Sequence, residues 1–288
     1  MLTALTVKTE EVRNWYERLF NKIRGNSITV DIKSARGVAL RHITYINRNG
    51  SVNWFEIENE IGDSRDRILC DDSVLLPENM GFTRFENTVF KARLSCNLGL
   101  YVLSKLSGEA PGIKAALYDV NGDYSEFLKS FFHYAENRGE KSSRGFGELC
   151  VITDNREVYE KAAAEIMDES GAAVFISERR DNLSDCALII APERIEESLP
   201  VSGGAIVLTG FAPTVCIPGL VYFDYHFRMP NMFDRIKPES LSCEYFAGAL
   251  FSKGRQYELG SIVPTTCSNL TSSQTPRSIC DYLLRTAR

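Results

Sequence analysis

Short apolar runs that alternate with amphipathic stretches dominate the second half of the chain. Apolar runs lie at 149–153, 172–176 and 186–190, and an amphipathic pattern fills the interval between the first two. Strands that alternate with helices are typical of a parallel sheet covered by helices. Further strands are expected at 114–118, 205–209 and 220–223, and further helices at 124–136, 240–252 and 276–286.

The first half of the chain has a different pattern. Apolar residues recur at three- and four-residue steps between positions 9 and 24, which predicts a helix that ends at Gly25. Alternating runs predict short strands at 28–32, 38–46 and 51–57. Asn49-Gly50 between the last two indicates a hairpin, because a tight hairpin turn needs positive φ at both central residues. We expect a small antiparallel sheet here, followed by a helix at 87–107.

The segment Ser-Gly-Glu-Ala-Pro-Gly at 107–112 ends that helix and is the predicted domain boundary. The fold class expected is therefore α/β in two parts. Residues 1–110 form a smaller N-terminal α+β domain with an antiparallel hairpin. Residues 111–288 form a larger domain with a mostly parallel sheet and helices on both faces.

Composition narrows the class of protein. The 288 residues are 44% hydrophobic and 25% charged, as in a globular protein, and the net charge is −5. The sequence has no basic block and no apolar run long enough to cross a bilayer, so neither nucleic acid nor a membrane is an expected partner. Eight scattered cysteines without a C-x-x-C pair, and no recognisable signal peptide, favour reduced thiols and a cytoplasmic location.

The strand–helix–strand unit at 149–180 resembles the βαβ unit of dinucleotide-binding (Rossmann) domains, and the runs at 184–192 and 203–209 resemble their later strands. The resemblance covers about the C-terminal 60% of the chain and implies a Rossmann-like domain of uncharacterised function. That family has a glycine motif after its first strand, where the backbone approaches a diphosphate. Here Thr153 to Glu157 follow the strand without a glycine. Asp154 and Glu157 have the spacing of a helix cap, so we expect no conventional NAD binding at this turn.

Three charged residues follow the next predicted strand. The resemblance implies an acid at that position for a ribose hydroxyl, or an arginine for the 2′-phosphate of NADP. Glu178, Arg179 and Arg180 are therefore the candidate cofactor-binding residues, with Arg228 as a further anion-binding arginine. A solvated turn without a ligand is the alternative interpretation.

The candidate catalytic residues lie beyond the last predicted strand. Asp224, His226 and Arg228 would share one side of an extended segment, where His226 could act as a general acid or base. The alternative is a polar surface ribbon. Cys267 is a candidate nucleophile if His226 lowers the pKa of its thiol through the fold. The segment around it, 264–276, is rich in hydroxyl groups. We interpret this segment either as an anion-binding loop or as a surface loop.

No metal site is expected. The segment Asp-Val-Asn-Gly-Asp at 119–123 resembles the start of a calcium loop, but Tyr124 and Ser130 stand where glycine and glutamate are required. A strand-to-helix turn is the better interpretation. The P-loop, nucleophile-elbow and zincin patterns are also absent from the sequence.

Three functions stay open at this point, and the sequence does not decide whether the protein is an enzyme. The first is a small-molecule-binding or regulatory protein on a Rossmann-like scaffold, which the glycine-free turn favours. The second is an NADP-dependent oxidoreductase that uses Arg179, Arg180 and His226. The third is a scaffold or homo-oligomer whose N-terminal helix and hairpin bind partners, with Trp15 and Trp54 as anchors.

Overall fold

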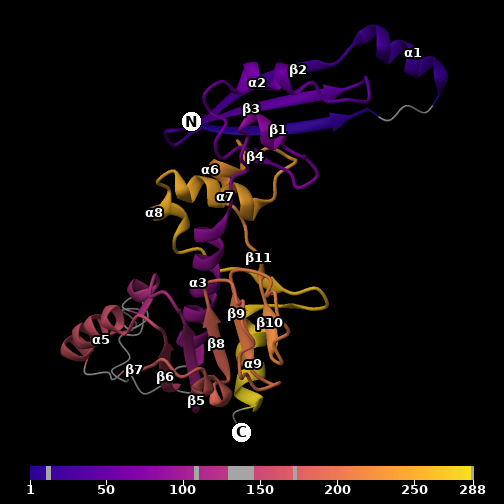
Figure 1. Cartoon of the computed structure of the whole chain (residues 1–288). Coiled ribbons are helices and arrows are strands. Elements are labelled where there is room, and N and C mark those ends of the chain that lie inside the picture. The colour runs from indigo at the N-terminus through magenta and orange to yellow at the C-terminus, as the bar shows by residue number, and fades with distance from the viewer. Residues whose placement is uncertain (11–13, 107–109, 129–145, 171–173, 287–288) are drawn as a thin grey trace. The chain divides into compact units, whose positions relative to one another are not determined.

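The computed structural model describes residues 1–10, 14–106, 110–128, 146–170 and 174–286. Contacts between Cα atoms divide the chain into two compact units (Figure 1). Unit 1 combines Met1–Asn87 with Met229–Leu259, and unit 2 combines Thr88–Arg228 with Gly260–Arg288. The chain therefore passes between the units three times. The boundary predicted at 107–112 includes residues outside those described and stays a prediction.

Unit 2 is built on a six-stranded sheet in which every neighbouring pair of strands is parallel. Its strands are β5 (Ala110–Tyr118), β6 (Phe146–Ile152), β7 (Phe175–Ser177), β8 (Leu188–Ala191), β9 (Ile206–Thr209) and β10 (Leu220–Tyr222). They lie in the order β7-β6-β5-β8-β9-β10. Counted along the chain this is 3-2-1-4-5-6, the order of dinucleotide-binding folds. The predicted parallel sheet is confirmed, and its first strand is β5.

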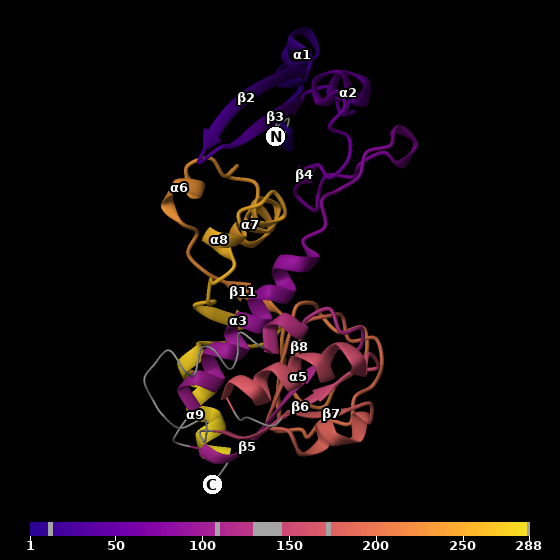
Figure 2. The same cartoon turned by 90° about the vertical axis from the view of Figure 1, so that its left-hand side faces the viewer.

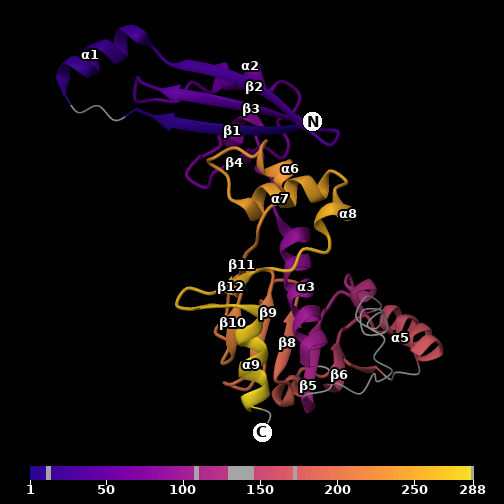
Figure 3. The same ribbon diagram turned by 180° about the vertical axis from the view of Figure 1, so that it is seen from behind.

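Helices flank this sheet as expected, and a glycine sets how closely one of them packs. They are α3 (Thr88–Leu106), α5 (Arg156–Ser170) and α9 (Pro276–Thr286), and α3 and α9 lie side by side in Figures 2 and 3. A Cβ atom on Gly99 of α3 would lie only 2.3 Å from Cδ1 of Ile190 in β8. A further set of side chains from the central strands packs against buried residues of the segments that connect the strands. Leu183 of the 3-10 helix η2 (Arg180–Asp185) is one of those buried residues.

A small antiparallel sheet follows the parallel one in unit 2. It pairs β11 (Asp224–His226) with β12 (Thr266–Ser268), and β12 with β13 (Ser273–Gln274). The hydroxyl-rich segment is therefore a β-hairpin, and reading it as a loop was wrong. The Asn269 side chain closes the hairpin, since its Oδ1 accepts hydrogen bonds from the backbone N–H of Thr271 at 2.9 Å and of Ser272 at 2.8 Å.

Unit 1 contains a four-stranded mixed sheet in the order β2-β3-β1-β4. Its strands are β1 (Leu2–Thr9), β2 (Ser27–Ala35), β3 (Val38–Asn47) and β4 (Leu69–Cys70). β2 and β3 form an antiparallel hairpin through Arg36 and Gly37, which both have positive φ, whereas β1 runs parallel to β3 and β4. The sheet expected to be antiparallel is therefore mixed. The helix predicted from residue 9 begins only at Trp15, because β1 extends to Thr9.

The hairpin predicted at Asn49-Gly50 was wrong. The following segment is the helix α2 (Trp54–Ile61), which buries Ile57 and Ile61 against the sheet at a four-residue step. Asn26 holds the turn from the side, since its Oδ1 accepts hydrogen bonds from the backbone N–H groups of Arg48 and Asn49. Tertiary contacts therefore override the local hairpin signal.

The remaining helices of unit 1 are α1 (Trp15–Arg24), the 3-10 helix η1 (Glu78–Met80), α6 (Asn231–Asp234), α7 (Cys243–Ser252) and α8 (Gln256–Leu259). The predicted helix at 240–252 corresponds to α7, whose N-terminus is capped by Ser242 through the N–H of Tyr245. In the described part of the chain, no helix combines the length and apolar character needed to cross a membrane.

Candidate functional site

A crevice lies at the carboxyl ends of the central strands of unit 2. The connections after β5 and β8 leave the sheet in opposite directions, which opens a crevice at this switch point. Its volume is about 780 Å³. The side chains that line it begin α3, end β5, or follow β5, β7, β8 and β9: Thr88, Val89, Tyr118, Val120, Asn121, Asp123, Tyr124, Arg180, Glu193, Arg194, Glu196, Glu197 and Phe211.

The turn after β5 binds its own carboxylate. Asp119 is fully buried, and its two oxygens accept hydrogen bonds from the N–H groups of Gly122 at 3.1 Å and Tyr124 at 2.9 Å. The Tyr159 hydroxyl of α5 donates a third. Burial raises the pKa of the Asp119 carboxyl, and these three hydrogen bonds oppose that rise. Amide groups at this turn are the ones that face a diphosphate in dinucleotide-binding folds, and here a side chain occupies two of them.

This geometry corrects the expectation about the turn at Thr153–Glu157. Because β5 is the first strand, the dinucleotide turn of this topology is 119–124, and Thr153 follows the second strand. Asp154 does not cap α5, since both of its oxygens bind Arg180. The Thr153 hydroxyl instead accepts the N–H of Asn155 at 3.1 Å. Asp154 thus stands after the second strand, where the resemblance places the ribose-binding acid.

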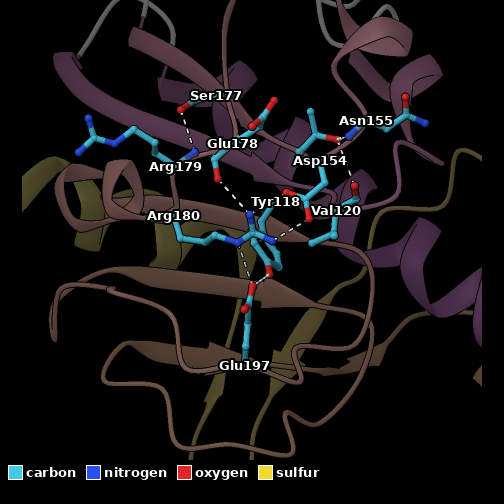
Figure 4. A network of polar contacts seen from close by, with 10 residues as sticks. Tyr118, Val120, Asp154, Asn155, Ser177, Glu178, Arg179, Arg180 and Glu197 are labelled. Carbon is cyan, nitrogen blue, oxygen red and sulfur yellow. Dashed lines mark hydrogen bonds and ion pairs between the residues drawn. The ribbon is translucent and has the colours of Figure 1, made fainter.

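Arg180 connects three segments at this edge of the sheet (Figure 4). Its guanidinium donates to Asp154 at 2.7 and 2.9 Å, to Glu197 at 3.0 Å and to the carbonyl oxygen of Glu178 at 3.0 Å. The Tyr118 hydroxyl, at the end of β5, donates to the same Glu197 oxygen at 2.6 Å. These contacts hold the pKa of Asp154 and of Glu197 below their usual range, and they raise the pKa of Arg180. We call this set of contacts the Arg180 clasp.

Glu193 is the half-buried acid among the residues that line the crevice. It directly follows the buried segment Ala191-Pro192, and the Asn121 amide donates to both of its oxygens at 3.0 and 3.1 Å. Burial raises the pKa of Glu193, and the nearby carboxylates of Asp119 and Asp123 raise it further. The guanidinium of Arg194, the next residue along the chain, lies over the Phe211 ring at 5.6 Å.

Of the candidate cofactor-binding residues, only Arg180 lines the crevice. The side chain of Arg179 is 77% exposed and lies 3.6 Å from Asp181. Glu178 is exposed and contributes its backbone carbonyl to the Arg180 clasp. Arg228 lies on an exposed position after β11 and does not reach the crevice.

The candidate catalytic residues are brought together only in part. Asp224 and His226 lie on the exposed side of β11, with Nε2 of His226 3.4 Å from Oδ2 of Asp224, and Ser268 donates to that same oxygen at 3.1 Å. Cys267 pairs across the sheet with the buried Tyr225, so its side chain is on the opposite face from His226. Burial raises the pKa of the Cys267 thiol to about 12. A protonated thiol without a histidine beside it is poorly suited to act as a nucleophile.

The described residues contain no group of three or more His, Cys, Asp or Glu side chains that could hold a metal ion. Chemically, the lining of the crevice offers carboxylates, two guanidinium groups, tyrosine hydroxyls, an amide and aromatic rings.

Sequence reasoning missed most of the crevice, above all Asp119, Asn121 and Glu193. A signal for Glu193 was present, since it follows an uninterrupted apolar run by one proline. For Asp119 the signal was an acid directly after a strand and three residues before Gly122, a spacing that allows a carboxylate to bind turn amides.

Comparison with known proteins leaves the family open. No family model and no curated protein matches the chain. A solved structure that is similar to it is L-tryptophan dehydrogenase from Nostoc punctiforme, at 12% sequence identity and a TM-score of 0.29. That match covers 99% of this chain and 81% of the dehydrogenase. A TM-score this low carries no argument, so the Rossmann-like description rests on the strand order of unit 2.

Proposed function

We propose that the protein binds a small, non-phosphorylated molecule with a cationic amino group in the crevice at the end of β5 and β8. The observation that carries this proposal is the turn after β5, where the Asp119 carboxylate occupies amides that a diphosphate would need. A second anion brought to that turn would be repelled by the buried carboxylate as well as excluded by it.

The charges of the lining support an amine. Among the described residues, Asp123, Glu193, Glu196 and Glu197 face the crevice together with two arginines, Arg180 and Arg194. Arg180 is already bound by two carboxylates, and Arg194 by an aromatic ring.

Glu193 is the side chain expected to bind the amine. Burial raises its pKa, the carboxylates of Asp119 and Asp123 add to that rise, and an ammonium group placed beside it would favour the ionised form. The Tyr118, Tyr124 and Phe211 rings offer apolar surface for the rest of the ligand.

The test is a thermal-shift screen of the full chain with agmatine, spermidine and tyramine, and with NADH and NADPH as dinucleotide probes. A ligand at about a hundred times its dissociation constant stabilises the folded state by about 2.7 kcal/mol. We expect stabilisation by at least one amine, lost in Glu193→Gln and retained in the matched control Glu178→Gln, whose side chain is exposed outside the crevice. The affinity should also fall as the pH is lowered and Glu193 takes up a proton.

An NADPH shift without an amine shift would refute the proposal. It would favour the NADP-dependent oxidoreductase instead, in which Arg180 leaves Asp154 and Glu197 to bind the 2′-phosphate. In that case Arg180→Ala should abolish the shift and Glu193→Gln should leave it unchanged.

A further inference from the structure

Within the part of the chain that the structure describes, the strand β2 forms one border of the sheet in unit 1, with β3 as its neighbouring strand. Its nine residues pair with β3 in a continuous register from Ser27 to Ala35, without a bulge. Six consecutive residues, 29–34, are exposed. A border strand of this length, without proline or bulge, presents backbone N–H and C=O groups to which another strand can bind.

The two faces of β2 differ in chemistry. The register sets Val30 opposite Ile43 and Asp31 opposite His42, so even-numbered residues share the face of the buried core and odd-numbered residues share the polar face. On the core side, Val30 is 38% exposed and Ile32 is 68% exposed. These apolar side chains lie at the border of the core, where a second strand would cover them.

The sequence of β2 is complementary to itself in one antiparallel register. When two copies pair around Ile32, each Asp31 lies opposite Lys33 of the second copy, and the Ile32 side chains face each other. Moving the register by two residues in either direction sets Asp31 against Asp31, or Lys33 against Lys33. Opposite charges directly across a strand pair stabilise it and like charges destabilise it, so the charges select the register centred on Ile32.

We propose that two copies of this chain form a symmetric dimer through antiparallel pairing of their β2 strands around Ile32, so that the sheet of unit 1 continues across both copies. The same patch serves both partners, as a twofold axis requires. An interface made mainly of one strand from each copy is small, and we expect a dissociation constant on the order of micromolar.

Sedimentation velocity of the full chain between about 1 and 100 μM tests the proposal. The mass should move from 32.4 kDa towards twice that value as the concentration rises. Asp31→Lys creates two Lys–Lys pairs in the dimer, and Lys33→Asp creates two Asp–Asp pairs. Each single variant should raise the dissociation constant at least about tenfold. The double variant Asp31→Lys/Lys33→Asp restores both opposite-charge pairs and should dimerise as the unchanged chain does.

Two controls separate this pairing from other modes of association. Lys8→Asp changes an exposed charge on the same face of the sheet, away from the β2 border, and should leave dimerisation unchanged. Ile32→Cys sets two thiols directly opposite each other, within the range that a disulfide can bridge, and should cross-link on mild oxidation. Val30→Cys sets its thiol opposite Ser34 of the second copy and should not cross-link. The unchanged chain reports any background from the native cysteines.

A protein that stays monomeric at 100 μM would overturn the proposal. A dimer would also overturn it if the single charge reversals did not weaken association, if the double variant did not recover it, or if Val30→Cys cross-linked as readily as Ile32→Cys. Circular dichroism of each variant tests whether a loss of dimer comes from a loss of fold. Because residues 29–34 are exposed, we expect each variant to keep its fold.

Discussion

Removing the Arg180 side chain should destabilise unit 2 by about 1–2 kcal/mol at neutral pH. The guanidinium makes four hydrogen bonds, two of them to Asp154 and one to Glu197. Charge-assisted bonds of this kind contribute more when they are buried, but the two carboxylates are 51% and 52% exposed, and solvent screens them. Arg179→Ala is the matched control, since that side chain is 77% exposed, and it should change stability by less than about 0.5 kcal/mol.

The sign of the pH dependence follows from the two carboxylates. Arg180 holds the pKa of Asp154 below its usual range, and Tyr118, together with Arg180, does the same for the pKa of Glu197. The stabilisation is therefore present above the unfolded-state values, at about pH 4, and is lost as the pH falls through the lower folded-state values. The difference between Arg180→Ala and the unchanged protein should be largest near pH 7 and should shrink below about pH 4.

Urea unfolding at pH 7 and pH 3.5 measures this difference. Both tryptophans, Trp15 and Trp54, are in unit 1, so tryptophan fluorescence follows unit 1, and far-ultraviolet circular dichroism, to which both units contribute, is needed to follow unit 2. Equal stability of Arg180→Ala and Arg179→Ala at pH 7, or an equal loss from Arg180→Ala at both pH values, would refute a stabilising role for the Arg180 clasp.

Three other changes probe the packing of unit 2. Gly99→Ala should lower the free energy of unfolding by about 1–3 kcal/mol, because its Cβ would overlap buried Ile190; calorimetry showing no loss would contradict the close packing of α3 on β8. Asp119→Ala should lower the free energy of unfolding by about 3 kcal/mol or more, because the substitution leaves two turn amides and a tyrosine hydroxyl without their acceptor. A loss below about 1 kcal/mol in urea unfolding would show that water replaces the carboxylate. In the native protein a thiol reagent should modify exposed Cys216 before buried Cys267, and peptide mass mapping measures the order. The reverse order would show that the Cys267 thiol is reactive.

The central strands of unit 2 could be predicted from sequence because they are buried. Every residue of β8 and β9 is buried, so each strand appears as an uninterrupted apolar run. Their order in the sheet could not be predicted in the same way. The segment 114–118 was recognised as a strand, but periodicity does not reveal that it is the first strand and lies at the centre of the sheet.

Because the order of the strands could not be predicted, only part of the candidate site could be predicted from sequence. Arg180 was found because it follows a strand, yet its partners Asp154 and Glu197 are 26 and 17 residues away in sequence. Only the lateral order of β7, β6, β5 and β8 brings these segments to one edge. Local signals were sufficient for the helix predicted at 240–252, which corresponds to α7. They failed at Asn49-Gly50, where the side chain of Asn26 decides the turn.

The return of the chain to unit 1 has a consequence for folding during synthesis on the ribosome. The sheet of this unit is complete once Asn87 has been made, but its last helices belong to Met229–Leu259, which follow the whole parallel sheet. At the usual speed of translation this segment emerges roughly ten to thirty seconds later. Until then the sheet of unit 1 has to persist without the helices of residues 229–259, which belong to the same unit. A nascent chain stalled before residue 229 should consequently recruit chaperones more strongly than one stalled after residue 259.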